Sequence, residues 1–159
     1  MQPDFVIKGN PVIKKNSRPI YRNQKNGVSF LGKSKRLVDA ETDAISQIKK
    51  QSRDIIEPLP ITYRVHIRFL FYSRTRAFRD LSNLYEFPQD VLQAAGIIKN
   101  DYLIESHDGS RKLYDKENPR TEIYIEPFIV WCFICTNAIC QATIKSAVKP
   151  FHARGELDR

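Results

Sequence analysis

Four acidic residues in the middle of the chain have the types and the spacing needed to bind a divalent cation. Asp80 precedes a helical pattern, and Glu86 and Asp90 lie four residues apart within it. Asp101 follows the helix after a short connection. Residues four apart share a helix face, and carboxylates held together repel one another unless a cation such as Mg²⁺ or Mn²⁺ lies between them. The spacing also fits a simpler arrangement, in which Asp80 caps the helix and the other carboxylates are solvated.

Residues that bind phosphate groups flank this acidic stretch. The residues that we expect to contact DNA are Lys14, Lys15, Asn16, Ser17, Arg18, Arg74, Arg76 and Arg79. Lys and Arg neutralise phosphates, and Asn and Ser donate neutral hydrogen bonds to phosphate oxygens. Tyr21 and Phe78 lie beside these residues and suit either stacking on an opened base or ordinary packing.

The net charge of +8 is distributed unevenly along the 159 residues. Residues 1–80 have a net charge of +10, and residues 81–159 have a net charge of −2. Such a division suits a protein that holds a polyanion on one surface and presents carboxylates on another. A solvated basic surface without a partner is the alternative.

Several motifs keep a distinctive order and spacing between residues 5 and 126. They are Gly9-Asn10-Pro11 with Lys14-Lys15-Asn16-Ser17-Arg18, then Arg79-Asp80-Leu81-Ser82-Asn83-Leu84, then Asp90-Val91-Leu92, Ala95-Gly96 and Asn100-Asp101. In these motifs the chain resembles the RusA family of Holliday-junction resolvases, which are crossover junction endodeoxyribonucleases often encoded by phages or prophages. The resemblance implies a homodimeric, Mg²⁺-dependent endonuclease that cuts four-way DNA junctions symmetrically during recombination and repair.

The resemblance also assigns roles to the acidic residues. Asp80, Asp90 and Asp101 match the family's acidic positions, with Asp80 and Asp101 the first choices as metal ligands. Ser82 departs from the pattern, because the best-known members have a second Asp there, and Glu86 stands where they have a Lys. We hypothesise that Glu86, four residues from Ser82, supplies the missing carboxylate and joins the catalytic and metal-binding set.

Two rival functions follow from the same residues. If Glu86 does not compensate for Ser82, the chain is a junction-binding protein without catalysis. The other rival is a structure-selective nuclease that cuts other branched DNA or RNA. His107 is a further candidate ligand, although His107-Asp108-Gly109 reads more simply as a turn with an exposed histidine.

The hydrophobic pattern predicts elements that would position these residues. Spacing of three and four residues predicts helices over 34–53 and 83–95, although Pro88 conflicts with the second. The predicted strands cover residues 5–9, 61–72, 102–104 and 121–125, with a hairpin turn at Asn26-Gly27. The sequence therefore predicts an α+β fold with a mixed sheet of about four strands and two main helices.

Composition limits the remaining possibilities. A nuclease-like domain is expected over residues 1–127, followed by an apolar tail over 128–159 whose polar residues argue against a membrane span. Cys132, Cys135 and Cys140 do not form a disulfide framework, and they lack the fourth ligand that a zinc site needs. The N-terminus has no signal-peptide pattern, so we expect a cytoplasmic protein.

Overall fold

The computed structural model describes residues 2–14, 19–22, 25, 27–55, 58–76 and 80–128. The expected tail beyond Phe128 and its cysteines lie outside these residues. The elements, in chain order, are β1 (Phe5–Lys8), β2 (Ile20–Arg22), β3 (Ser29–Leu31), α1 (Lys35–Gln51), η2 (Ser52–Asp54), β4 (Val65–Ser73), α2 (Leu81–Ala94), η3 (Asp101–Leu103), β5 (Ile104–Ser106), β6 (Arg111–Tyr114) and β7 (Arg120–Pro127).

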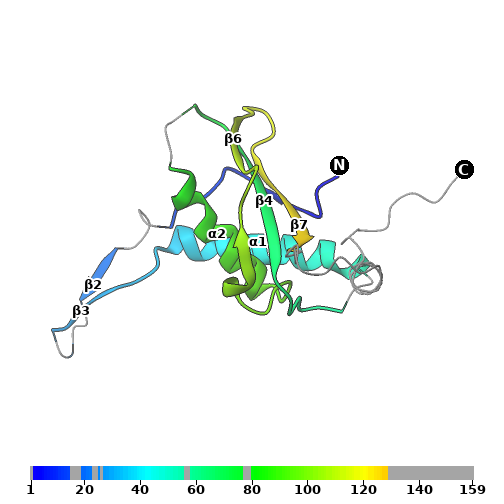
Figure 1. Ribbon diagram of the computed structural model, residues 1–159. Helices are drawn as coiled ribbons and strands as arrows, with labels where there is room; N and C mark the ends of the chain where they lie inside the picture. The colour runs from blue at the N-terminus through cyan, green and yellow to red at the C-terminus, as the bar shows by residue number, and fades with distance from the viewer. Residues whose placement is uncertain are drawn as a thin grey trace, which may run out of the picture.

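A mixed five-stranded sheet forms the centre of the molecule. β1, β7, β4 and β5 lie side by side in that order, and β6 also pairs with β4. β7 runs antiparallel to β1 and β4, whereas β5 and β6 run parallel to β4. Helices α1 and α2 lie on one side of this sheet (Figure 1). The predicted α+β fold is confirmed, with one strand more than the four expected.

The core lies between the helices and the covered face of the sheet. Alternate residues of β4 are buried, as the sequence predicted, and both helices contribute apolar residues at three- and four-residue spacing. Its main members are Ile67, Phe69 and Phe71 of β4, Leu37, Ala44 and Ile48 of α1, and Leu84, Phe87, Val91 and Leu92 of α2. Burial of these side chains is the main driving force for the fold.

Pro88 lies inside α2 without ending the helix. The helix begins at Leu81, two residues earlier than predicted, and continues to Ala94. Pro88 removes one backbone hydrogen bond, but it is buried beside Phe87. Packing of the apolar face therefore outweighs the lost bond, since most helical stability in proteins comes from tertiary contacts.

Strands β5 and β6 occupy one edge of β4, and the loop between them satisfies the backbone of β4. Ser110 Oγ accepts a hydrogen bond from the Phe69 amide at 2.9 Å, and His107 Nδ1 lies 3.0 Å from the Ile67 carbonyl oxygen. Gly109 has a φ of +76°, which confirms the expected turn at this point. Between β5 and β6, side chains thus take the place of the backbone hydrogen bonds that a continuous strand would make to β4.

His107 is half-buried rather than exposed as the simpler reading expected. Its ring stacks on Tyr85 with centroids 4.4 Å apart, and its Nε2 lies 2.7 Å from Nε2 of Gln89. Donation from Nδ1 to the Ile67 carbonyl leaves Nε2 as the acceptor, so the ring is neutral. Burial lowers the pKa of His107, although the bond to Ile67 opposes this effect. His107 therefore packs against α2 and stabilises its position.

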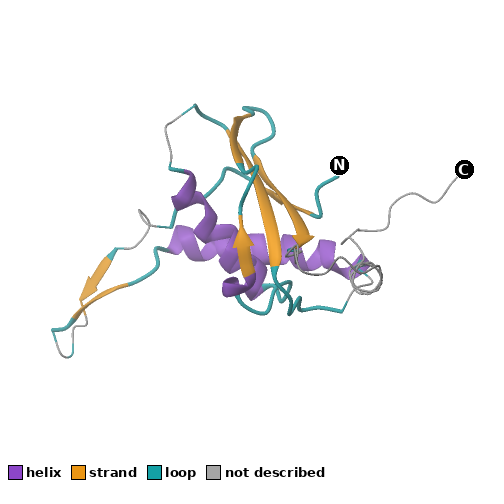
Figure 2. Ribbon diagram, in the orientation of Figure 1, coloured by secondary structure: helices purple, strands orange, loops and turns teal. Residues whose placement is uncertain are grey.

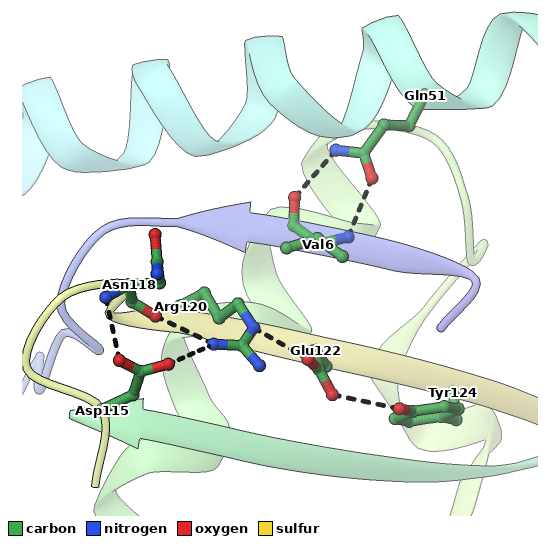
Figure 3. A network of polar contacts seen from close by, with 7 residues as sticks. All are labelled: Val6, Gln51, Asp115, Asn118, Arg120, Glu122 and Tyr124. Carbon is green, nitrogen blue, oxygen red and sulfur yellow. Dashed lines mark hydrogen bonds and ion pairs between the residues drawn. The ribbon is translucent and has the colours of Figure 1, made fainter. Parts of the chain in front are cut away.

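Two glutamines of α1 cover the outer edge of β1. The Gln51 amide accepts from the Val6 N–H and donates to the Val6 carbonyl, both at 2.8 Å (Figure 3). Gln47 accepts from the Lys8 N–H at 2.7 Å. An unpaired strand edge is a template for aggregation, so these side chains protect β1 while fixing α1 across it.

The sheet face opposite the helices carries a polar network. Arg120 bonds Asp115 at 2.9 Å and Glu122 at 2.8 Å (Figure 3). The Arg120 guanidinium also lies 3.7 Å from the centre of the Tyr72 ring. The Tyr124 hydroxyl donates to Glu122 at 3.0 Å. Burial, and then the Glu122 carboxylate, raise the pKa of Tyr124 to about 12. The network holds β7 to β4 on the face that neither α1 nor α2 covers.

Strands β2 and β3 form a separate two-stranded ribbon. Ile20 pairs with Leu31, Tyr21 with Phe30 and Arg22 with Ser29, which confirms the predicted hairpin. The ribbon projects away from the sheet and helices, as Figure 2 shows. Within the described residues, no helix is long and apolar enough to cross a membrane.

Candidate functional site

Helix α2 presents a line of polar residues opposite its buried face. Ser82, Glu86 and Asp90 follow one another at four-residue intervals, and all three are exposed. This spacing places them along one stripe of the helix, while Leu84 and Val91 face the core. The expected proximity of Glu86 to the position of Ser82 is therefore consistent with the helix geometry.

Asp80 begins α2 with its carboxylate available. It occupies the N-cap position, but its side chain makes no capping bond to the helix backbone. The carboxylate Oδ2 instead accepts a hydrogen bond from Asn83 Nδ2 at 3.1 Å. The Asp80 side chain therefore does not cap the helix, contrary to the simpler interpretation, and the residue is exposed.

Asp101 lies beyond the other end of α2. It is the first residue of η3, where the Asn100 side chain accepts a hydrogen bond from the Tyr102 amide at 3.3 Å. The strand predicted over residues 102–104 is therefore displaced, and the strand β5 begins at Ile104. The Asp101 side chain is exposed. Fourteen helical residues span about 21 Å, so the chain enters and leaves α2 at well-separated points.

Asp90 is paired with a lysine from the N-terminal loop. Lys14 forms ion pairs with Asp90 and with Glu41 of α1, whose Oε1 lies 3.6 Å from the Lys14 ammonium. Only 4% of the Lys14 side chain is exposed, against 52% for Asp90. Burial lowers the pKa of Lys14, while Glu41 and, more weakly, Glu86 oppose that effect. The ammonium thus supplies positive charge to one side of the acidic stripe.

This position differs from the one expected of a phosphate contact. Lys14 was predicted to face DNA, but its ammonium lies between helices α1 and α2. The pairing could not be found from local sequence signals, because Lys14, Glu41 and Asp90 are far apart in the chain. Only the packing of α1 on α2 brings them together. Lys33 also bonds Glu41, at 2.6 Å, and both cations therefore share one carboxylate.

The four carboxylates do not form a complete metal site within one chain. Among residues 2–14, 19–22, 25, 27–55, 58–76 and 80–128, no three Asp, Glu, His or Cys side chains are grouped so that they could hold a metal ion. The prediction that Asp80, Glu86, Asp90 and Asp101 would surround one cation is thus not met by these residues. The reason is geometric, since Asp80 and Asp101 lie at opposite ends of α2 and Asp90 already has a cationic partner.

The predicted DNA-binding residues are only partly described. Arg74 and Arg76 are exposed in the loop after β4, just before Asp80. The Arg74 amide donates to Asn10 Oδ1 at 3.0 Å, and the Arg76 guanidinium lies 4.8 Å from the centre of the Tyr114 ring. Lys15, Asn16, Ser17, Arg18, Phe78 and Arg79 lie outside the described residues. Arg76 and Arg74 precede Asp80 by four and six residues in the sequence, and their contact with DNA stays a prediction.

Comparison with known proteins adds no family assignment. No protein-family model matches the chain, and no curated protein matches it.

Proposed function

We propose that the chain is a metal-dependent endodeoxyribonuclease that cuts four-way and related branched DNA. The proposal rests mainly on Asp80 at the start of α2. Its carboxylate is exposed, makes no capping bond to the helix backbone and directly follows a basic loop. A nuclease needs a carboxylate that is accessible to a metal ion and that lies next to cations able to hold the phosphate backbone. The RusA-like motifs around Asp80 favour DNA junctions as the substrate.

Asp80 would hold a metal ion in one chain, and Asp101, beyond the opposite end of α2, would reach the same ion only from a second copy of the chain. Mg²⁺ is commonly bound by one or two carboxylates together with water and substrate phosphate, so a single chain need not supply three ligands. The remaining ligands would come from water, from the DNA or from a second copy of the chain. When bound, the metal would lower the pKa of a water molecule and offset negative charge at the scissile phosphate.

The protein's own side chains would position the DNA for this reaction. Arg74 and Arg76 would neutralise phosphates next to Asp80, which offsets the repulsion between a carboxylate and DNA. Asn83 holds the Asp80 carboxylate through its side-chain amide and so limits its rotation. A homodimer would present two such sites to two symmetric strands of a junction.

A junction-binding protein without catalysis is the second candidate. Two observations favour it: Ser82 carries no carboxylate, and the Asp90 carboxylate is already paired with Lys14. In this case the acidic stripe of α2 would be structural and the basic residues alone would account for DNA binding.

The deciding experiment incubates the purified protein with a labelled four-way junction, with and without Mg²⁺ or Mn²⁺. We expect paired, symmetric nicks that require metal and fall at least a hundredfold in Asp80→Asn and in Asp101→Asn. The matched control is Glu126→Gln, which removes an exposed carboxylate at the end of β7 and should cut normally. Flap and RNA substrates cut as fast as the junction would instead identify a broader structure-selective nuclease.

Two further variants separate the catalytic from the binding proposal. Glu86→Ala should reduce cutting if Glu86 supplies the carboxylate that Ser82 lacks, and normal cutting would refute that role. Tight junction binding without cutting in either metal would refute the nuclease. Ser82→Asp is then the first change expected to restore cleavage.

A further inference from the structure

The β2–β3 ribbon carries exposed apolar side chains. We call its described part, residues 19–22, 25 and 27–31, the arm. Ile20 is 73% exposed, Val28 is 57% exposed and Tyr21 is 42% exposed. Strand alternation places Ile20 and Arg22 on one face and Tyr21 on the other, and Val28 directly precedes β3. The arm is therefore apolar on both faces, unlike a hairpin that packs one face on a core.

The charged residues of the arm and of the sequence on either side of it have a single sign. Between Asp4 and Asp39 the chain contains nine Lys or Arg residues and no Asp or Glu. Arg22 and Lys25 lie on the arm itself. A partner must therefore offer negative charge together with flat apolar surfaces. Nucleic acid meets both requirements, through its phosphates and its base faces.

Three ion pairs hold the base of the arm against the helices. Lys14 precedes the arm and Lys33 follows it, and both lysines bond the carboxylate of Glu41 on α1. Lys14 also pairs with Asp90 of α2. The arm thus begins beside the acidic stripe of α2 and projects away from the sheet (Figure 1). DNA that lies along α2 would come within its reach.

We propose that the arm binds branched DNA by placing Ile20 and Val28 against unstacked bases at the branch point. A two-stranded ribbon fits the major groove, and apolar side chains inserted between base steps are a known way to hold distorted DNA. At a branch the base stacking is already interrupted, so insertion costs less there than in a continuous duplex. A wedge that is apolar on both faces suits the space between two stacked helices. The inference rests on the proposed function for its choice of DNA as partner.

The test compares the affinity for a four-way junction with that for a linear duplex of equal nucleotide number, by fluorescence anisotropy in EDTA. The variant Ile20→Thr/Val28→Thr removes apolar surface but retains β-branched residues and charge. We expect its junction affinity to fall about tenfold, because a base contact of this kind is worth a factor of that order, and its duplex affinity to change less than about twofold. The control, Val38→Thr, alters an exposed apolar residue of α1 and should bind both DNAs normally.

Two further measurements identify how the arm acts. A 2-aminopurine base beside the branch should brighten when the unaltered protein binds and should stay dim with Ile20→Thr/Val28→Thr. Arg22→Gln/Lys25→Gln should reduce the slope of log affinity against log salt concentration by about 2 on both DNAs, since each phosphate contact contributes about 0.9.

Several outcomes overturn the proposal. The arm does not read the branch if the threonine variant loses no affinity, or loses the same affinity for both DNAs. A shift from dimer to monomer in sedimentation of that variant would make the arm a contact between copies. Because EDTA removes cleavage from the measurement, the two proposals can fail separately. A protein that prefers junctions through the arm but never cuts them supports the arm and refutes the nuclease.

Discussion

Lys14 places a cation between two carboxylates that the fold has brought together. Its ammonium pairs with Glu41 and Asp90, and Glu86 lies close enough to influence its pKa. Burying an ammonium is costly unless charged partners replace the lost water. The pairs also join the N-terminal loop, α1 and α2, so one side chain fixes three segments. The Lys14 cation therefore offsets the repulsion that the acidic stripe would otherwise produce.

Replacing Lys14 with Met should destabilise the protein more than replacing Lys33. Lys14→Met retains the length of the side chain but leaves the mostly buried Glu41 carboxylate without its internal cation. We expect the free energy of unfolding to fall by about 2 to 4 kcal/mol, because removing one partner of a buried pair costs about 3 to 5 kcal/mol and Lys33 still pairs with Glu41. Lys33→Met removes an exposed partner of the same Glu41 and should cost less than about 1 kcal/mol.

Urea denaturation of both variants measures the difference. A loss for Lys14→Met no larger than that for Lys33→Met would show that the buried pair contributes nothing beyond a surface ion pair. The comparison is matched, because both changes replace a lysine that pairs with Glu41.

The Gln51 contact shows how a helix can complete the edge of a strand. Its amide bonds both backbone groups of Val6, as a neighbouring strand would. Gln51→Leu should leave the Val6 N–H and carbonyl without their partners and lower the free energy of unfolding by about 1 to 3 kcal/mol. The control, Gln93→Leu, changes an exposed glutamine of α2 and should alter stability by less than about 0.5 kcal/mol.

Amide hydrogen exchange tests the same contact locally. The Val6 amide should exchange faster in Gln51→Leu than in the unaltered protein, because its acceptor has been removed. Unchanged exchange at Val6 would mean that water replaces the glutamine without loss.

Elements with local signals could be predicted from the sequence, and those that depend on distant contacts could not. The Ser34 side chain accepts a hydrogen bond from the Leu37 amide at 3.3 Å. The cap of α1 and its apolar spacing therefore both depend on residues that are close together in the sequence. The hairpin turn also has a local cause, since Gly27 has a φ of +70°. Short β6 lacks alternation and exists because Ser73 and its neighbours on β4 pair with it.

The start of β4 shows the same limit. The sequence predicted a strand from Ile61, but the structure begins it at Val65. Ile61 instead pairs with Ile98, and the Ile61 amide donates to the Ile97 carbonyl at 2.8 Å. Ile61 therefore pairs with the loop after α2 and does not extend β4. No pattern within residues 61–72 contains that information. The Lys14 ion pairs were missed for the same reason.

At the scale of the whole molecule, the charged residues of the proposed DNA-binding surface lie on several elements. The basic arm, the basic loop of Arg74 and Arg76, and the carboxylates of Asp80 and Asp101 lie on different elements joined by α1 and α2. In the absence of metal, those carboxylates should repel the phosphates that the basic residues attract. The effect of each carboxylate on DNA affinity therefore tests whether that carboxylate faces the DNA. The measurement does not require cleavage.

Neutralising either carboxylate should tighten DNA binding when no metal is present. Asp80→Asn and Asp101→Asn should each raise the affinity for a four-way junction about two- to fivefold in EDTA, because each removes one exposed charge facing the phosphates. The gain should shrink as salt is added, since screening weakens the repulsion. Glu126→Gln removes the same charge from the end of β7 and should leave the affinity unchanged if DNA lies along α2. Equal gains in all three variants would mean that only net charge matters and that Asp80 and Asp101 do not face the DNA.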